Sequence, residues 1–283
     1  THLFLEIDPH ELGTMPFALS SDAPLDLKAR DLGLKAAHPG AHVHLLPSIA
    51  AYVGADTVGV LLASVSALDD DITLIVDIGT NAEIVLGSRD FLLASSSPTG
   101  PAFEGAQISH GQRAAAGAIE RFRYDGATGR VRYKIVGDPR WSDELPPGET
   151  LAPTGICGSG IIEIVAELAR AGVMRTSGRL PPSDSHARVR TNGKSGEFVV
   201  APADETATGR DIVVTQHDIR AIQLAKAALF AGIRLLMEQK GIDRIDRIKL
   251  AGAFGSYIDP LYAMRIGLIP VCDLERVEIA GNA

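Results

Sequence analysis

The stretch Val76-Asp77-Ile78-Gly79-Thr80-Asn81 decides the fold, because it places a turn directly after a run of β-branched and leucine residues. The run from Thr73 to Ile78 is typical of a buried strand. The turn offers a tight backbone and successive N–H groups that would cradle an anion, from Gly79, Thr80 and Asn81. The carboxylate of Asp77 is suited to hold Mg²⁺ through water molecules. An ordinary hairpin, with aspartate and glycine as turn formers, is the alternative interpretation of these residues alone.

Outward from this turn, the sequence predicts two more strands, at residues 81–86 and 91–95. The three strands would form a β-meander with no room for crossover helices. A long irregular stretch over 96–117 follows, in which Glu104 stands close to glycines and is a candidate site acid. Residues 120–136 alternate like a hairpin around Asp125-Gly126.

A second glycine-rich segment, Thr154 to Gly160, precedes a predicted helix over 161–171. The unpaired amides and positive dipole of a helix N-terminus suit a phosphate, so the candidate contacts are Gly158, Ser159 and Gly160. The segment is neither a Walker loop nor a dinucleotide fingerprint. A cap that permits close packing is an equal alternative, and Cys157 is interpreted as a buried small residue rather than a nucleophile.

A third glycine segment ends a predicted strand over 247–251 and consists of Gly252, Ala253, Phe254 and Gly255. Small residues at this position would let a flat base or ribose lie against the backbone. Phe254 or Tyr257 would stack on the base, or else serve as core or hinge side chains.

Other expectations concern segments outside these motifs. Asp56 is either an active-site acid or a polar residue inside a predicted helix over 49–67, which follows a short buried strand at 43–47. A long helix is expected from Thr215, with Asp218 in its first turn and apolar residues at 219, 222, 224, 228, 229, 233 and 236, to about Gly241. Residues 175–210 are predicted to be a polar surface excursion. The histidines at 38, 42 and 44 are predicted to lie in a surface loop rather than to bind a metal.

Composition excludes several classes of function. The formal net charge is -8 and no long run of either sign occurs, which argues against a nucleic-acid surface. No apolar run is long enough to span a membrane. The two cysteines, Cys157 and Cys272, fit a reducing, cytoplasmic compartment and cannot supply the four thiolates of a conventional iron–sulfur cluster.

Together these segments resemble the superfamily of actin, the sugar and acetate kinases and the heat-shock chaperone ATPases. Its fold is α/β and ribonuclease H-like, with mixed sheets flanked by helices. In that fold a meander turn binds phosphate and a later strand–glycine turn binds adenosine. More narrowly, the chain resembles the ATPase domain of the reductive activators of corrinoid proteins. The residues that carry this match are 46–57, 77–87, 97–111, 155–160 and 250–270.

The resemblance implies that ATP and Mg²⁺ bind, that Asp77, Glu104 and Asp56 have catalytic roles, and that a corrinoid protein is the partner. Such activators use ATP to drive the reduction of cob(II)alamin to cob(I)alamin. Their electrons come from an amino-terminal ferredoxin-like domain with a [2Fe–2S] cluster. Residues 1–71 would be the remainder of the first actin-like lobe and residues 72–283 the second lobe, with 175–210 as an inserted region.

The family's first phosphate turn and its cluster domain are absent from this sequence. We therefore expect a fragment of a longer activator, one that binds ATP weakly by itself; a homodimer is one assembly open to it. Three alternatives stay open. The first is a small-molecule kinase with Asp56 as base. The second is an activator of 2-hydroxyacyl-CoA dehydratases with cluster thiolates from Cys157 and Cys272, whose surroundings differ from that family. The third is a non-catalytic nucleotide-sensing or docking module.

Overall fold

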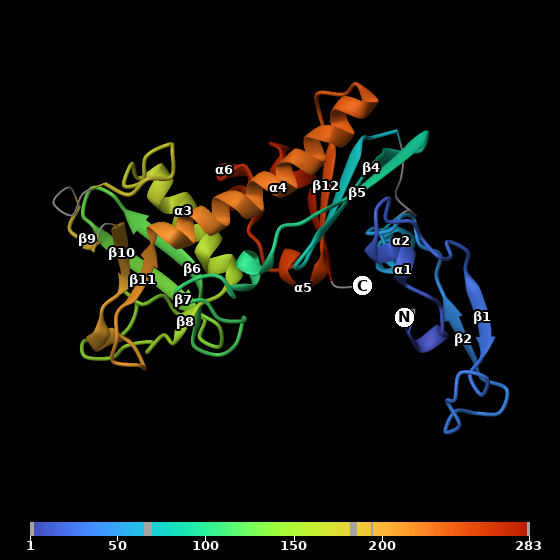
Figure 1. The fold of residues 1–283 in the computed structure, drawn as a ribbon. Helices are drawn as coiled ribbons and strands as arrows, with labels where there is room; N and C mark the ends of the chain where they lie inside the picture. The colour runs from blue at the N-terminus through green and yellow to red at the C-terminus, as the bar shows by residue number, and fades with distance from the viewer. Residues whose placement is uncertain (1–2, 65–69, 182–185, 194, 282–283) are drawn as a thin grey trace.

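The protein is described by a computed structural model that covers residues 3–64, 70–181, 186–193 and 195–281. Its central element is a five-stranded mixed sheet with the order β13-β12-β3-β4-β5 (Figure 1). The predicted meander is confirmed: β3 (Thr73–Ile78), β4 (Ala82–Ser88) and β5 (Phe91–Ser97) pair in antiparallel order. The strands β12 (Arg247–Ala251) and β13 (Val277–Gly281) extend the sheet in parallel on the other side of β3.

Helices cover both faces of this sheet. Alternate residues of β3 and β4, such as Val76 and Ile84, join the main core with Leu229 and Ile233 of α4 (Gln216–Lys240). The intervening residues Ile75 and Val85 pack instead in a smaller cluster with Val60 of α2 (Ala55–Ser64). The period of two along each strand therefore supplies an apolar layer to both helices.

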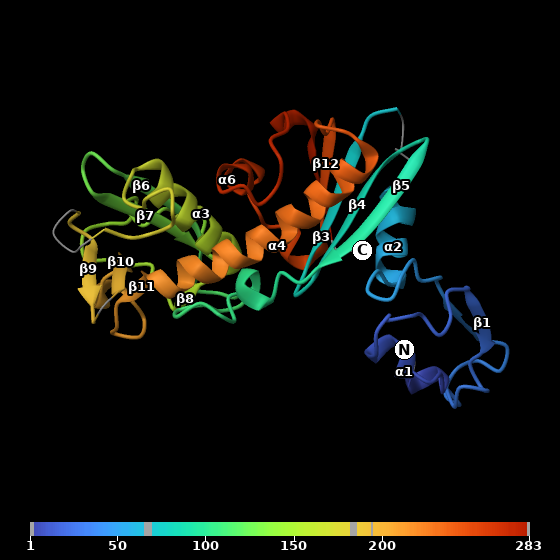
Figure 2. The same ribbon diagram turned by 45° about the horizontal axis from the view of Figure 1, so that its top comes forward.

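A second group of strands lies at the far end of α4 (Figure 2). The predicted hairpin is β6 (Ala118–Asp125) and β7 (Arg130–Ile135), with the short β8 (Gly155–Ile156) parallel to β6. A separate antiparallel sheet contains β9 (Val189–Asn192), β10 (Ser195–Ala201) and β11 (Ile212–Thr215).

The interpretation of residues 175–210 as a surface excursion is wrong for β10. Phe198 and Val200 on β10 are fully buried, and Phe198 packs edge-on against Phe122 and Tyr124 of β6. The polar and glycine residues around these strands dominate the composition of the segment, and they hid a short buried strand between them.

The long helix α4 begins and ends as predicted. The side chain of Thr215 accepts from the amide of Asp218 in a reciprocal capping box, and Gly241 closes the helix in the left-handed conformation. Its predicted apolar face is wrong at Leu224, whose side chain is exposed, because this position lies roughly 160° around the helix from the buried stripe.

The remaining helices are short. The helix α3 (Gly158–Arg170) begins three residues before the predicted start at 161. Two further helices follow β12, namely α5 (Gly252–Gly255) and α6 (Pro260–Arg265). Single 3₁₀ turns occur at η1 (Leu3–Leu5), η3 (Pro101–Glu104), η5 (Ala203–Glu205) and η6 (Leu274–Arg276).

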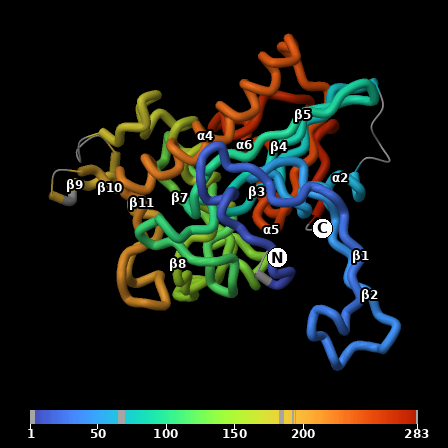
Figure 3. The backbone as a smooth tube through the Cα atoms, turned by 45° about the vertical axis from the view of Figure 1, so that its right-hand side comes forward, coloured from blue at the N-terminus to red at the C-terminus, as the bar shows by residue number. Residues whose placement is uncertain are grey.

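The N-terminal part lies on the side of the five-stranded sheet away from the β6–β8 group (Figures 1 and 2). Its β1–β2 hairpin extends away from the rest of the molecule (Figure 3). This part contains α1 (His10–Gly13), β1 (Leu25–Lys28) and β2 (His42–Leu45). Two predictions are corrected here. The strand at 43–47 is not buried, since β2 alternates between exposed and half-buried residues, and α2 begins at Ala55 rather than at residue 49. The predicted end of α2, at residue 67, lies outside the described residues.

Across the part of the chain that the structure describes, no helix combines the length and the apolar character needed to cross a bilayer.

Candidate functional site

The phosphate turn and the Gly252–Gly255 turn lie side by side. β3 and β12 are parallel neighbours, and Asp77 is in register with Ala251 at the carboxyl ends of both strands. Gly252 has a φ of +86°, and a Cβ atom there would stand 2.3 Å from Oδ1 of Asp77 and 2.9 Å from the carbonyl oxygen of Ile78. Only glycine permits this approach, so the sheet brings together two motifs that are far apart in the sequence.

The turn after β3 differs in one respect from its predicted geometry. The N–H of Gly79 donates to the carbonyl oxygen of Asn81 at 2.9 Å, so it is occupied within the turn. The prediction that all three amides would face an anion is therefore wrong for Gly79. Thr80 and Asn81 are exposed, and among the described backbone groups their N–H donors have no carbonyl partner.

Two side chains from the following loop hold this turn. Thr99 is buried, and its hydroxyl donates to the carbonyl oxygens of Thr80 at 3.1 Å and Gly79 at 3.4 Å. Glu104, predicted as a site acid, accepts a 2.6 Å hydrogen bond from the hydroxyl of Thr80. The structure thus places Glu104 at the turn, its role as a site acid stays a prediction, and the sequence analysis missed Thr99. The signal for Thr99 was the register of the meander, because Ala82 pairs with Ser97 and the residues just after Ser97 must run beside the turn.

The carboxylates near the turn repel one another. Burial, followed by the charge of Asp56, raises the pKa of Asp77 above its usual value. Burial also raises the pKa of Glu83, with the charges of Asp56 and Asp77 adding to the effect. The fold therefore gathers three acids that a bound cation would stabilise in their ionised form. Glu83 was missed at the sequence level because its position on a strand gave no sign of a neighbouring acid.

Asp56 lies in the first turn of α2, where its Oδ1 accepts from the amide of Thr57 at 2.9 Å. It borders a hollow of about 660 Å³ between α2 and the N-terminal segment. The neighbouring Thr57 is buried, and its hydroxyl oxygen is the one buried side-chain polar atom in the described residues with no hydrogen-bond partner. Thr57 does not line this hollow, so its hydroxyl is an unsatisfied group inside α2 rather than a contact for an occupant.

No three or more metal-ligating side chains converge on one point among the described residues. Asp77 and Asp56 would therefore offer oxygens to a largely hydrated cation rather than form a closed cage, and this is the coordination that Mg²⁺ favours. The histidines at 38, 42 and 44 are exposed, and His44 Nδ1 pairs with Asp26 at 2.9 Å.

The glycines at the start of α3 serve close packing. A Cβ atom on Gly158 would lie 1.7 Å from the carbonyl oxygen of Phe103 and 2.2 Å from the ring of Phe254. A Cβ atom on Gly160 would lie 2.2 Å from the carbonyl oxygen of Ile119. These contacts match the packing alternative that the sequence left open.

The other two side chains at this helix start are also engaged. Ser159 is buried and donates to the carbonyl oxygen of Glu120 at 3.2 Å. Cys157 is buried, and its thiol donates to the carbonyl oxygen of Ile119 at 3.3 Å. A direct ligand contact of Gly158, Ser159 or Gly160 stays a prediction.

Phe254 stacks on Phe103, with ring centroids 5.7 Å apart and ring planes at 5°. One face of its ring is thereby used for packing between α5 and η3. Ala253 and Tyr257 are exposed beside it, while Gly255 is buried. Stacking of Phe254 or Tyr257 on a base stays a prediction.

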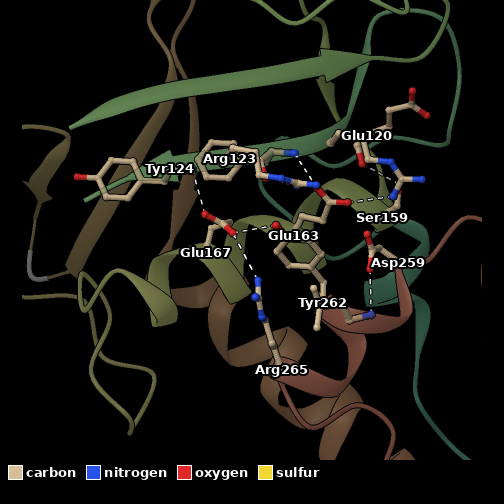
Figure 4. Close-up of polar contacts among 12 residues, drawn as sticks. Glu120, Arg123, Tyr124, Ser159, Glu163, Glu167, Asp259, Tyr262 and Arg265 are labelled. Carbon is tan, nitrogen blue, oxygen red and sulfur yellow. Dashed lines mark hydrogen bonds and ion pairs between the residues drawn. The ribbon is translucent and has the colours of Figure 1, made fainter. Parts of the chain in front are cut away.

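A buried ionic network supports the segment after α5 (Figure 4). Glu163 of α3 accepts from Arg121 at 2.9 Å and from Arg123 at 2.5 Å, and Arg121 also reaches the carbonyl oxygen of Tyr257 at 3.4 Å. Glu167 accepts from the hydroxyl of Tyr262 on α6 at 2.9 Å. Sequence reasoning missed both glutamates, because nothing in an apolar helix indicates which acids will be buried and paired.

The pKa values of the two glutamates move in opposite directions. Burial raises the pKa of Glu163 despite its two arginine partners. Burial acts to raise the pKa of Glu167 as well, but hydrogen bonds from Arg170, Tyr262 and the amide of Tyr124 outweigh it, and the net shift is downward.

Comparison with known proteins identifies the same fold. Residues 71–283 match the family described as the C-terminal domain of RACo, the ASKHA domain, and residues 1–68 match the RACo middle region. A solved reductive activator for a corrinoid, iron-sulfur protein superimposes with a TM-score of 0.83 and 39% identity, over 99% of this chain and 43% of that one. The predicted actin-like fold is thereby confirmed.

Two curated proteins are similar in sequence. The corrinoid activation enzyme RamQ of Eubacterium limosum is 37% identical over 290 residues, which cover 99% of this chain and 46% of RamQ. A reductase of the Co(II) methylated amine-specific corrinoid protein, from Methanosarcina barkeri, is 27% identical over 234 residues. These residues cover 79% of this chain and 39% of the reductase. The chain thus spans less than half the length of these relatives. From these matches and from the geometry of the β3 and β12 turns, the chain belongs to the RACo family of corrinoid reductive activators, with that family's ASKHA domain over residues 71–283.

Proposed function

We propose that this chain is the nucleotide-binding part of an activator that uses ATP to drive the reduction of cob(II)alamin to cob(I)alamin on a corrinoid protein. The observation that carries the proposal is the contact between Gly252 and Asp77, which brings the predicted phosphate turn beside the predicted adenosine turn. The names of the relatives support the corrinoid partner, since one activates corrinoids and another reduces a corrinoid protein.

Each residue of the site has a distinct part in this proposal. The free amides of Thr80 and Asn81 would hold phosphate oxygens, and Glu104 keeps the Thr80 hydroxyl in place. Asp77 and Asp56 would hold Mg²⁺ through water. Gly252 and Ala253 would lie against the adenosine.

ATP hydrolysis would supply the free energy for the uphill electron transfer, and the protein's part is to couple it to docking of the partner. Residues 1–71 would complete the first actin-like lobe, and residues 72–283 would form the second. We also propose that the electrons come from a [2Fe–2S] cluster outside this chain, because its two cysteines cannot hold one.

Isothermal calorimetry with Mg²⁺ and ATP on the full-length protein tests the proposed site. Asp77→Asn should weaken binding at least about tenfold, which corresponds to ~1.4 kcal/mol. Asp90→Asn removes one charge from an exposed turn between β4 and β5 and should leave the affinity unchanged. Equal affinities for both variants would contradict the assignment.

Radiolabelled ATP separates the proposed activity from the kinase alternative. An activator releases inorganic phosphate and reduces the corrinoid protein in step with it, which the absorbance spectrum of cob(I)alamin reports. A kinase would transfer the label to a small molecule instead, with Asp56 as the base. ATP binding with neither outcome would favour the non-catalytic sensing module.

A further inference from the structure

The β6–β7 hairpin presents basic residues on one face. In its register Arg121 stands opposite Lys134, and Arg123 stands opposite Arg132. Like charges directly opposite each other destabilise an antiparallel pair. Two such pairs in adjacent positions are therefore unexpected in a chain whose net charge is -8.

The fold neutralises only the inner end of this array. Glu163 alone accepts from both Arg121 and Arg123. Within the described ranges, no carboxylate lies within 4.0 Å of the charged groups of Arg130, Arg132 or Lys134. At the outer end Asp125 stands opposite Arg130 in the register, without an ion pair within 4.0 Å. Arg132 and Lys134 thus keep their capacity to pair with an anion from outside the molecule.

An aromatic ring lies among these cations. Trp141 is the single tryptophan of the chain. Its ring centroid is 4.8 Å from the guanidinium of Arg132, 5.0 Å from the ammonium of Lys134 and 5.4 Å from the guanidinium of Arg123. Tryptophan and arginine are the residues most enriched at the energetic centres of protein–protein interfaces.

The basic array borders a hollow of about 560 Å³. Five arginines and three acids line it, and the arginines are Arg123, Arg130, Arg132, Arg170 and Arg265. Two of the acids are already engaged: Glu167 pairs with Arg170 at 2.7 Å, and Asp125 accepts from the amide of Ala127 and the hydroxyl of Thr128 in its own turn. The arginines outnumber the acids, but three of them are paired as well: Arg123 with Glu163, and Arg170 and Arg265 with Glu167. Arg130 and Arg132 are therefore the lining cations that a ligand carboxylate could reach.

The shape of the array indicates the kind of ligand. From Arg130 to Lys134 the strand rises by roughly 14 Å, and the cations continue across to β6. A single phosphate would cover only a part of that length, whereas a chain of carboxylates would follow it. We propose that Arg121, Arg123, Arg130, Arg132, Lys134 and Trp141, the cationic face, dock an acidic segment of a protein partner. The acidic remainder of the molecule would repel such a partner and direct it to this face.

The intrinsic fluorescence of Trp141 reports binding at this face alone, because no second tryptophan contributes. Hexaglutamate titrated into the chain of residues 1–283 should change the emission in a saturable way, and hexalysine should not. Salt should weaken the binding, since the contacts are exposed ion pairs. Diglutamate should bind at least about tenfold more weakly than hexaglutamate, because it reaches fewer cations.

Matched variants test the residues. Arg130→Gln with Arg132→Gln should weaken hexaglutamate binding at least about tenfold. Arg130→Lys with Arg132→Lys keeps both charges and should retain most of the affinity. Arg89→Gln with Arg244→Gln removes two exposed arginine charges elsewhere and should have no effect. Thermal unfolding of every variant shows whether the fold is kept, and the lysine pair keeps the test valid if the glutamine pair does not fold.

Three results would overturn the proposal. Unchanged binding in the Arg130 and Arg132 glutamine variant would show that the peptide binds elsewhere. Diglutamate or inorganic phosphate binding as tightly as hexaglutamate would indicate a small-anion pocket. A response to hexalysine would show a non-specific effect on the fluorescence. None of these results depends on ATP or on a corrinoid, so they do not bear on the proposed activity.

Discussion

At the scale of single residues, Gly252 connects the two halves of the candidate site. Alanine at this position would meet Asp77 and would also have to adopt a φ of +86°. We expect Gly252→Ala to lower the free energy of unfolding by roughly 1–3 kcal/mol and to weaken ATP binding, because the Asp77 carboxylate must move.

Gly241→Ala is the matched control for Gly252→Ala. Gly241 has a φ of +72°, but a Cβ atom added there would have no other atom within 4 Å. Alanine at this position therefore has the backbone strain without the clash. Urea unfolding should show a lower free energy of unfolding for both variants, with the larger decrease for Gly252→Ala. Calorimetry should show weaker ATP binding for Gly252→Ala alone. Equal ATP affinities in the two would contradict the role of the contact.

The ionisation of Asp77 makes stability depend on pH. Its pKa is raised in the folded state from the usual 3.8 by burial and by Asp56, so the native protein binds more protons than the unfolded chain above that pH. Stability is then lost as the pH rises through the raised pKa. Asp77→Asn cannot ionise, and it should raise the free energy of unfolding at about pH 7 with a gain that disappears near pH 4.

Asp138→Asn is a control for which the expected change in stability has the opposite sign. Arg140 lowers the pKa of Asp138 to about 2, so its ionised form stabilises the fold above the usual 3.8, and that stability is lost as the pH falls toward 2. Its asparagine variant should be less stable near neutral pH. Urea unfolding at both pH values checks the pair, and a pH-independent gain in Asp77→Asn would rule out ionisation as its cause.

At the scale of secondary-structure elements, α3 closes an open strand edge with two carboxylates. Beyond residue 119 the outer edge of β6 has no strand partner among the described residues. Glu163 accepts from the amide of Phe122 at 2.8 Å, and Glu167 accepts from the amide of Tyr124 at 3.1 Å.

The two spacings explain this fit. Four residues of helix rise about 6 Å and two residues of strand about 6.6 Å, so glutamates at i and i+4 match alternate amides of the strand. The helix thereby satisfies an edge that would otherwise expose its hydrogen-bonding groups.

This arrangement predicts a large cost for Glu167→Ala. The change would leave the amide of Tyr124 and the hydroxyl of Tyr262 without their acceptor, whereas the half-exposed Arg170 keeps the carbonyl oxygen of Tyr124. Each buried donor left unsatisfied costs roughly 1–3 kcal/mol, so we expect a loss of stability of roughly 2–6 kcal/mol in urea unfolding.

Glu238→Ala is the control for Glu167→Ala. Glu238 lies on the exposed face of α4, where it pairs with Arg234 at 3.5 Å, and its removal should change stability by less than about 0.5 kcal/mol. A similar small effect at Glu167 would show that water replaces the lost acceptor.

At the scale of the whole molecule, the five-stranded sheet and the β6–β8 group meet at Gly158. Its backbone touches Phe103 of η3 and Phe254 of α5, which belong to the side of the site. In most helices Gly→Ala is stabilising by about 0.5–1 kcal/mol. Here the Cβ atom would stand 1.7 Å from a backbone carbonyl oxygen, so we expect Gly158→Ala to destabilise by on the order of 3 kcal/mol.

Gly59→Ala on α2 is the control for Gly158→Ala, since a Cβ atom added at Gly59 would have its nearest neighbour 3.9 Å away. It should be neutral or stabilising by up to ~1 kcal/mol. Thermal and urea unfolding of both variants check the pair. If both are stabilised, the two parts of the molecule can separate slightly at Gly158 without cost.

The local features of the fold could be predicted from the sequence because they depend on neighbouring residues. The run Thr73–Ile78 and its turn indicated β3 and β4, and the cap at Thr215 together with Gly241 defined α4 within a residue or two. Errors arose where burial depends on distant partners. The residues around β10 are polar, yet Phe198 of this strand is buried because Phe122 and Tyr124 lie over it.

The sequence by itself determined the β3–β5 meander, the β6–β7 hairpin, the strand β12, the turn after Asp77, the glycine turn at Gly252 and the family resemblance, because backbone preference and side-chain period act over a few residues. Only the tertiary structure decided that Asp77 and Gly252 touch, that Thr99 holds the turn, and that Glu163 and Glu167 close the edge of β6. Those relations join residues between 19 and 175 positions apart, and strand register and helix packing set them rather than any local preference.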